Sequence, residues 1–150
     1  MTAEVAPLRV GFLLTSGREE SLVDEERDAF AWLRRVAGIR VHPISLPSLA
    51  RGESSELRDV AVLWWHGAWA AGFPEVGRAE PTCNAILDYL RRGGGVFLSL
   101  MAAEWPSLAG IEPSPPDVRV AGVYGEADGP KRGFHAFLSH PLFDPFRGGV

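Results

Sequence analysis

Three apolar segments of this chain lack the polar alternation that is expected of a strand with one solvated face. They are "LRVGFLL" at residues 8–14, "VAVLWW" at 60–65 and "GVFLSL" at 95–100. Such runs are typical of strands in parallel sheets, because helices cover both faces of those sheets. Parallel strands also require long crossover connections, which are usually helical. The sequence therefore predicts an α/β fold.

A first amphipathic helix is predicted over residues 24–38, "DEERDAFAWLRRVAG". Acidic residues occupy its first turn and arginines its last, which matches the helix dipole. Its apolar side would contain Ala29, Phe30, Trp32, Leu33 and Val36. Ser21 and Asp24 resemble a capping box at its start, and Gly38 is placed to end it.

A second helix is predicted over residues 82–92, "TCNAILDYLRR". Its apolar positions follow the i, i+3, i+4, i+7 spacing of one helix face. They are Cys83, Ile86, Leu87 and Leu90. The glycines at 93–95 precede a strand instead of opening a helix, so we interpret them as a helix stop and not as a phosphate loop.

The remaining segments complete the predicted order of strands and helices. "IRVHPISL" at 39–46 and "VRVAGVY" at 118–124 are predicted strands, and Pro43 favours an edge position for the first. "PSLARGESSELRD" at 47–59 is interpreted as a polar connection. Alternating strands and helices indicate one three-layer α/β domain with a mainly parallel sheet over residues 1–150.

Length, charge and cysteine content restrict the class of protein. A chain of 150 residues is long enough for one domain with a hydrophobic core. Its net charge of -4 provides no broad attraction to nucleic acid or to anionic membranes. Cys83 is the only cysteine, so no intrachain disulfide can form, and neither a signal peptide nor a membrane span is evident. We expect a cytoplasmic protein whose partner is a small molecule.

Candidate site residues follow the predicted strands, because open parallel sheets bind ligands beyond the carboxyl ends of their strands. They are Thr15 and Ser16 after the first strand, His66 and Trp69 after the third, and Met101, Glu104 and Trp105 after the fourth. His135 is a further candidate from "GFHAFLSHPLF". His66 would contact a ligand or act as a base, while Trp69 and Trp105 would form a platform for a sugar ring. The alternative is a histidine bonded to a loop beside tryptophans that cover the sheet edge.

The segment "GGGVFLSLMAAEW" has the strand, turn and helix order of a nucleophile elbow. Its presented position is most simply Met101, which offers no nucleophile, and Ser99 falls inside the predicted strand. A metal set of His66, Glu104, His135 and His140 lacks the i, i+4 spacing of a strong motif. We therefore expect neither a metal nor a cofactor.

Several segments together resemble the class I glutamine amidotransferase-like superfamily. They are "DVAVLWWHGAW", "ILDYLRRGGGVFLSLMAAEW" and "SHPLF". Within this superfamily they are similar to ThuA-like (trehalose utilisation) proteins and to related uncharacterised domains found beside glycoside hydrolases. The segment "DEERDAFAWLRR" is also similar to these uncharacterised domains. The resemblance implies a flavodoxin-like fold, a carbohydrate-related ligand and further strands after "HPLF", so we expect either a fragment of a longer protein or a member that is shortened at its C-terminus.

The same resemblance bears on catalysis. True glutaminases of this superfamily carry a cysteine at the elbow, where Met101 stands here, and Cys83 lies on a predicted helix. ThuA-like members often have a histidine near that position, which this sequence also lacks. The first hypothesis is therefore an amidotransferase-like domain without its nucleophile, binding a small polar, carbohydrate-related ligand. One alternative is a hydrolase or isomerase of a sugar derivative, with His66 as base and Glu104 as acid. Another is a structural module or homo-oligomer, in which a second chain covers Trp69 and Trp105.

Overall fold

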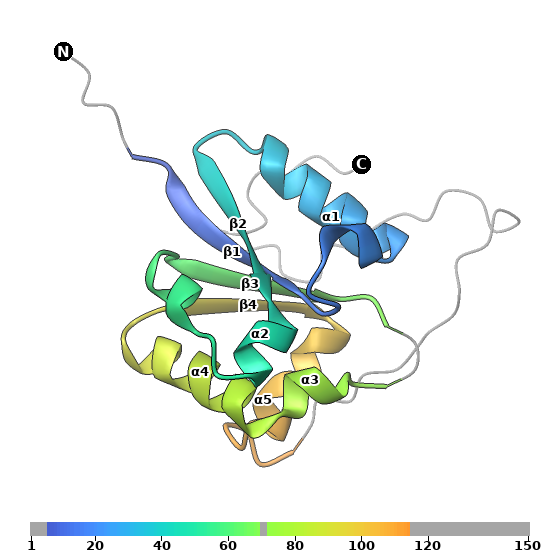
Figure 1. The fold of residues 1–150 in the computed structure, drawn as a ribbon, viewed down its shortest axis with the longest axis vertical. Helices are drawn as coiled ribbons and strands as arrows, with labels where there is room; N and C mark the ends of the chain where they lie inside the picture. The colour runs from blue at the N-terminus through green and yellow to red at the C-terminus, as the bar shows by residue number, and fades with distance from the viewer. Residues whose placement is uncertain (1–5, 70–71, 115–150) are drawn as a thin grey trace, which may run out of the picture. The chain divides into compact units, whose positions relative to one another are not determined.

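The computed structural model describes residues 6–69 and 72–114, which contain a sheet with helices on both sides (Figure 1). The strands are β1 (Leu8–Leu14), β2 (Ile39–Ser45), β3 (Val62–Gly67) and β4 (Gly95–Leu100). The helices are α1 (Asp24–Arg35), α2 (Leu46–Ala50), α3 (Glu75–Arg78), α4 (Glu80–Arg91) and α5 (Trp105–Leu108). Short 3-10 turns are η1 (Glu19–Ser21), η2 (Ser55–Arg58) and η3 (Met101–Glu104).

These residues belong to one compact unit that spans residues 1–118, and a second unit spans 119–150. The second unit lies outside the described residues. The predicted strand at 118–124, the candidate His135 and the neighbouring His140 therefore lie outside them as well.

The four described strands are parallel and follow the order β2-β1-β3-β4. This is the strand order of flavodoxin-like domains, in which the chain winds outward in both directions from β1 and β3. Helix α1 covers one face of the sheet, and α2, α3, α4 and α5 gather on the other (Figure 1). The predicted three-layer, flavodoxin-like α/β class is thus confirmed. Pro43 lies on β2 at one end of the order, as predicted.

The face of the sheet under α2, α3, α4 and α5, here called the α2–α5 face, carries the larger core. Trp65 and Leu63 of β3 are fully buried there, and Trp105 of α5 packs with them. Gly11 of β1 permits this close approach, because a Cβ at that position would come within 2.8 Å of the Leu63 side chain. Adding that methyl group would force the packed side chains apart.

The opposite face, here called the α1 face, has a smaller core. Phe12 of β1 packs against Phe30 of α1, with ring centroids 4.9 Å apart, and against the edge of Trp64. Beyond this contact the aromatic surface opens to solvent: Trp32 is 55% exposed and Phe97 is 48% exposed. The prediction that β4 is buried on both faces is therefore wrong for the described part of the chain.

Helix α1 differs from its prediction in two details. Its N-cap is Val23, which makes no side-chain cap, so the capping box predicted from Ser21 and Asp24 is wrong. Trp32 was expected on the apolar side of the helix, but it is exposed, whereas Phe30 is buried. Trp32 follows Phe30 by two positions. Residues two apart do not share a helix face, and the burial of Phe30 therefore turns Trp32 to solvent.

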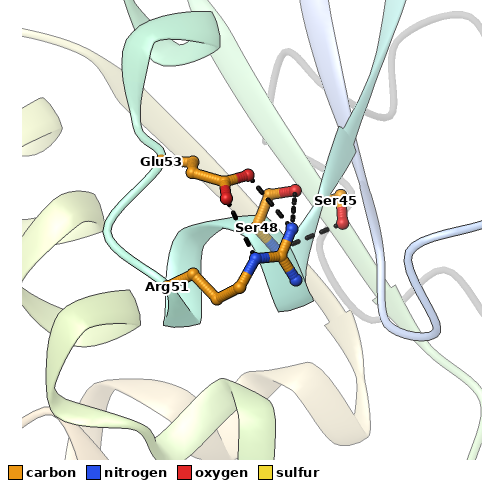
Figure 2. Close-up of polar contacts among 4 residues, drawn as sticks. All are labelled: Ser45, Ser48, Arg51 and Glu53. Carbon is orange, nitrogen blue, oxygen red and sulfur yellow. Dashed lines mark hydrogen bonds and ion pairs between the residues drawn. The ribbon is translucent and has the colours of Figure 1, made fainter.

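The segment 47–59, predicted as a polar connection, supplies α2, η2 and core side chains. Leu46, at the start of α2, is buried together with Leu49 and Leu57. Figure 2 shows how the polar residues hold this short segment. The Ser45 hydroxyl accepts a hydrogen bond from the Ser48 backbone N–H at 3.2 Å, which caps α2. The Arg51 guanidinium donates to both carboxylate oxygens of Glu53 at 2.9 and 3.0 Å, and to the Ser48 hydroxyl at 3.1 Å.

Helix α4 begins before its predicted start, at Glu80, and strand β3 is shifted towards the C-terminus and ends at Gly67. The buried residues of α4 are Thr82, Ile86 and Tyr89, with Cys83, Leu87 and Leu90 only partly covered. The helix stops before Gly93, whose φ of +90° is in the left-handed region that glycine adopts readily. The predicted glycine stop is thus confirmed, whereas the buried face is rotated from the predicted one.

Candidate functional site

A cavity of about 320 Å³ lies beyond the carboxyl ends of β1 and β3. Its polar lining consists of Thr15, Ser16, Ser21, Glu26, Trp69 and Glu75, and its apolar lining of Val23, Pro74 and Val76. Because the chain leads from β1 to β2 on one side and from β3 to β4 on the other, this cavity lies at the point where the strand order reverses. Flavodoxin-like domains bind their ligands at this point.

The turn after β1 places two hydroxyl groups at the rim of the cavity. The Gly17 N–H donates to the Leu14 carbonyl at 3.0 Å, and Gly17 has a φ of +79°, which closes the turn tightly. The Thr15 hydroxyl accepts a hydrogen bond from the indole N–H of buried Trp65 at 3.4 Å, and this contact orients the Thr15 side chain. Ser16 follows it within the same turn and lines the cavity.

Trp69 provides an aromatic wall. Its ring packs against Trp65 at 5.9 Å and edge-on against Phe73 at 5.3 Å, and it lies over Gly67, where a Cβ would overlap the ring. The Trp69 Nε1 is buried and has no hydrogen-bond partner within the described residues. A buried N–H without an acceptor costs about 1–3 kcal/mol, so an acceptor brought to this group would stabilise the site.

Two acidic residues of the cavity, Glu26 and Glu75, were missed by sequence reasoning, and Glu26 is the buried one. The residue is only 6% exposed, and its Oε1 accepts a hydrogen bond from the Ala68 backbone N–H at 3.4 Å. Burial raises the pKa of the Glu26 carboxyl; the Ala68 hydrogen bond opposes that rise and the charge of Glu25 reinforces it. One signal was present in the sequence: Glu26 precedes Phe30 by four positions, which places it on the buried side of α1.

His66 lies inside β3 and contacts a serine of the next strand. Its Nδ1 is 2.8 Å from the Ser99 hydroxyl, and the same oxygen accepts a hydrogen bond from the Trp64 indole at 2.8 Å. Burial lowers the pKa of His66, against an opposing influence of Glu25. With a neutral imidazole, Ser99 can accept from Trp64 and donate to Nδ1. His66 is not among the residues that line the cavity.

The sharp turn after β4 falls at Leu100, one residue earlier than predicted. Leu100 has φ 56° and ψ -133°, and it is the one non-glycine residue with positive φ in the described ranges. Such a conformation costs about 1–3 kcal/mol and is concentrated at functional sites. The residue presented by this turn is therefore an apolar leucine, with Met101 beginning η3 behind it. Neither side chain can act as a nucleophile.

The other candidates after β4 do not join the cavity. Trp105 is 1% exposed within the core of the α2–α5 face, so it cannot form the sugar platform that was expected with Trp69. Glu104 is half-buried in η3, and His66 makes its side-chain contact with Ser99 instead. Thus the structure brings together Thr15, Ser16 and Trp69 of the predicted set, and adds Glu26 and Glu75.

Two properties of the described residues bear on other classes of function. Within residues 6–69 and 72–114, no three His, Cys, Asp or Glu side chains cluster closely enough to hold a metal ion. In that same part of the chain, no helix has the length and apolar character needed to cross a membrane. Comparison with protein-family models gives no match, and comparison with curated proteins gives none either.

Proposed function

We propose that this domain binds a small polar, carbohydrate-related ligand in the cavity between the carboxyl ends of β1 and β3, without glutaminase chemistry. The observation that carries the proposal is Trp69, which lines the cavity together with Glu26 and whose buried Nε1 has no hydrogen-bond partner among the described residues. A volume of about 320 Å³ suits a compact ligand of a few rings or fewer.

The chemistry of the lining matches that of a sugar. Sugar hydroxyls both donate and accept hydrogen bonds, and the cavity offers carboxylate acceptors in Glu26 and Glu75 and hydroxyls in Thr15 and Ser16. The apolar C–H face of a sugar ring packs favourably against an aromatic ring such as that of Trp69. The carbohydrate class itself comes from the family resemblance, and the lone Cys83 suits a reducing compartment such as the cytoplasm.

A second candidate is a hydrolase or isomerase that acts on a sugar derivative. It is favoured by one observation, the buried Glu26 carboxyl, whose raised pKa brings it closer to the working range of a general acid or base. In this form of the hypothesis, Glu26 takes the acid–base role instead of His66 and Glu104.

A ligand screen by thermal unfolding tests the first proposal, with a panel of neutral monosaccharides and disaccharides as probes. A ligand at one hundred times its Kd adds about 2.7 kcal/mol to the free energy of unfolding. Trp69→Ala should abolish the stabilisation. Trp32→Ala is the matched control, because Trp32 is exposed on α1 and does not line the cavity. A folded protein that no sugar stabilises would exclude the carbohydrate class.

Glu26→Gln separates the two candidates. The glutamine side chain keeps a carbonyl oxygen to accept from the Ala68 N–H but cannot exchange a proton. A binding domain should retain its sugar affinity to within a few-fold in this variant. An enzyme should keep binding and lose turnover of the bound sugar derivative.

A further inference from the structure

A second cavity of about 320 Å³ lies at the opposite edge of the sheet, where β3 and β4 begin. Its apolar wall is formed by Leu57, Val60 and Tyr89, and two arginines, Arg58 and Arg92, line it as well. Arg58 comes from η2, before β3, and Arg92 follows the last residue of α4, before β4. Among the described residues that line this cavity, none carries a carboxylate.

The glycine turn before β4 shapes this cavity without supplying free donors. A Cβ on Gly94 would overlap the Tyr89 ring, so only glycine allows the turn to lie flat against that ring. The N–H groups of Gly93 and Gly94 donate to the Leu90 and Tyr89 carbonyls at 2.9 and 3.1 Å. Since these amides are occupied, any anion in the cavity would be bound by the arginine side chains.

The two arginines are free to bind such an anion. Within the described residues, neither Arg58 nor Arg92 forms an ion pair, although five other arginines do. Asp59, the residue after Arg58, pairs with Arg9 at 3.8 Å, and Asp88, one helical turn before Arg92, pairs with Arg91 at 2.7 Å. Arg58 and Arg92 therefore line the cavity, and no ion pair among the described residues compensates their charges.

We propose that this cavity is a binding site for the phosphate group of a small phosphorylated ligand, held between Arg58 and Arg92. A guanidinium fork matches the oxygens of a phosphate or a carboxylate. One fork engages both oxygens of a carboxylate, whereas a phosphate monoester has three terminal oxygens and keeps one of them free for a second guanidinium. The apolar wall of Leu57, Val60 and Tyr89 would contact the organic part of the ligand. This site is separate from the sugar cavity and stands whether or not a sugar binds there.

Isothermal titration calorimetry with phenyl phosphate and with inorganic phosphate tests the assignment. We expect both to bind, phenyl phosphate more tightly because of the apolar wall, and both to weaken as ionic strength rises. Arg92→Ala and Arg58→Ala should each weaken phenyl phosphate binding by about tenfold or more, because each removes hydrogen bonds to a charged group.

Arg35→Ala on α1 is the matched control, because it changes the net charge equally, forms no ion pair among the described residues and does not line the cavity. It should bind phenyl phosphate as the unmodified protein does. Arg92→Lys keeps the positive charge but lacks the guanidinium fork, so its affinity for phenyl phosphate should lie between those of the unmodified protein and Arg92→Ala. This variant also tests the proposal if an alanine variant fails to fold.

Three results would overturn the proposal. The first is an absence of phosphate binding by the folded protein. The second is equal loss of affinity in Arg35→Ala and Arg92→Ala, which would indicate general charge attraction. The third is binding of benzoate as tight as that of phenyl phosphate, which would make the site one for carboxylates. Sugar binding at the other edge of the sheet is unaffected by these variants if both proposals hold.

Discussion

Trp64 and Trp65 are neighbours in β3, yet they lie in different surroundings. Trp65 lies on the α2–α5 face and is fully buried, with Phe73 and Trp69 packed against its ring. Trp64 faces α1 and is only half-buried, with its N–H bonded to Ser99. The same side-chain type therefore serves two purposes. One face of the sheet provides most of the apolar burial, and the other combines a smaller core with titratable groups.

The sharpest test of this contrast is the pair Trp65→Ala and Trp64→Ala. Loss of a fully buried tryptophan costs about 3–5 kcal/mol of unfolding free energy, through lost burial and the cavity that remains. Trp64→Ala should cost roughly half as much, since part of its ring is already exposed to water. Chemical denaturation of both variants measures the difference.

Trp65→Ala could remove most of the stability of a domain whose total is about 5–15 kcal/mol. Trp65→Phe and Trp64→Phe then make the same comparison with a smaller change of volume. Equal losses in the two positions would contradict the contrast between the faces.

The next prediction concerns Glu26, on the α1 side. Its pKa is raised by burial above the unfolded value near 4.5, so folding favours the protonated carboxyl. The corresponding stability is fully present below pH 4.5 and is lost as the pH rises through the folded pKa. Glu26→Gln should therefore be more stable than the unmodified protein at neutral pH, and the gap should close in acid. A constant gap at all pH values, in denaturation curves, would argue against a buried, titrating Glu26.

His66 should give the opposite pH dependence. Burial lowers its pKa below the unfolded value of 6.5, so folding favours the neutral ring. That contribution is present above pH 6.5 and is lost as the pH falls through the folded pKa. His66→Asn keeps an oxygen near the position of Nδ1 to accept from Ser99 and cannot titrate there. Its unfolding free energy should fall less steeply than that of the unmodified protein below pH 6.5. Identical slopes would contradict the assignment.

The smallest effect is expected for Glu53→Gln, on the outer side of the segment that covers the α2–α5 face. Its carboxylate pKa is lowered by the hydrogen bonds from Arg51 and Ser48, so its contribution is present above pH 4.5 and lost below it. Both partners of this ion pair are exposed, and exposed pairs add little stability. We expect a barely measurable change in the melting temperature, which added salt should remove. A large effect would mean that this surface segment stabilises the fold more than its exposure suggests.

Some features of the fold followed from local pattern alone. The apolar runs predicted β1, β3 and β4 within a few residues, Pro43 predicted the edge strand, and Gly93 predicted the end of α4. Each of these rests on a property of a few consecutive residues, such as a missing N–H or an accessible positive φ. Patterns of this kind can be seen without knowing which segments meet.

The candidate site was only partly accessible to the same reasoning. Thr15, Ser16 and Trp69 were identified because they follow strands, whose carboxyl ends meet at one edge of a parallel sheet. Trp105 was misplaced because its position after β4 does not reveal that α5 turns it into the core. Glu26 was missed because an acid in the first turn of a helix has an ordinary explanation in the helix dipole.

The sequence by itself determined the class of the fold, because burial on both faces of a strand leaves a pattern in its own residues. Only the tertiary structure decided which polar groups meet. The contact between His66 and Ser99 depends on the register of β3 with β4, and the contact of Glu26 with Ala68 depends on how α1 docks at the end of β3. These contacts join residues more than thirty positions apart. Such pairings are set by the packing of whole elements, and no local run of residues encodes them.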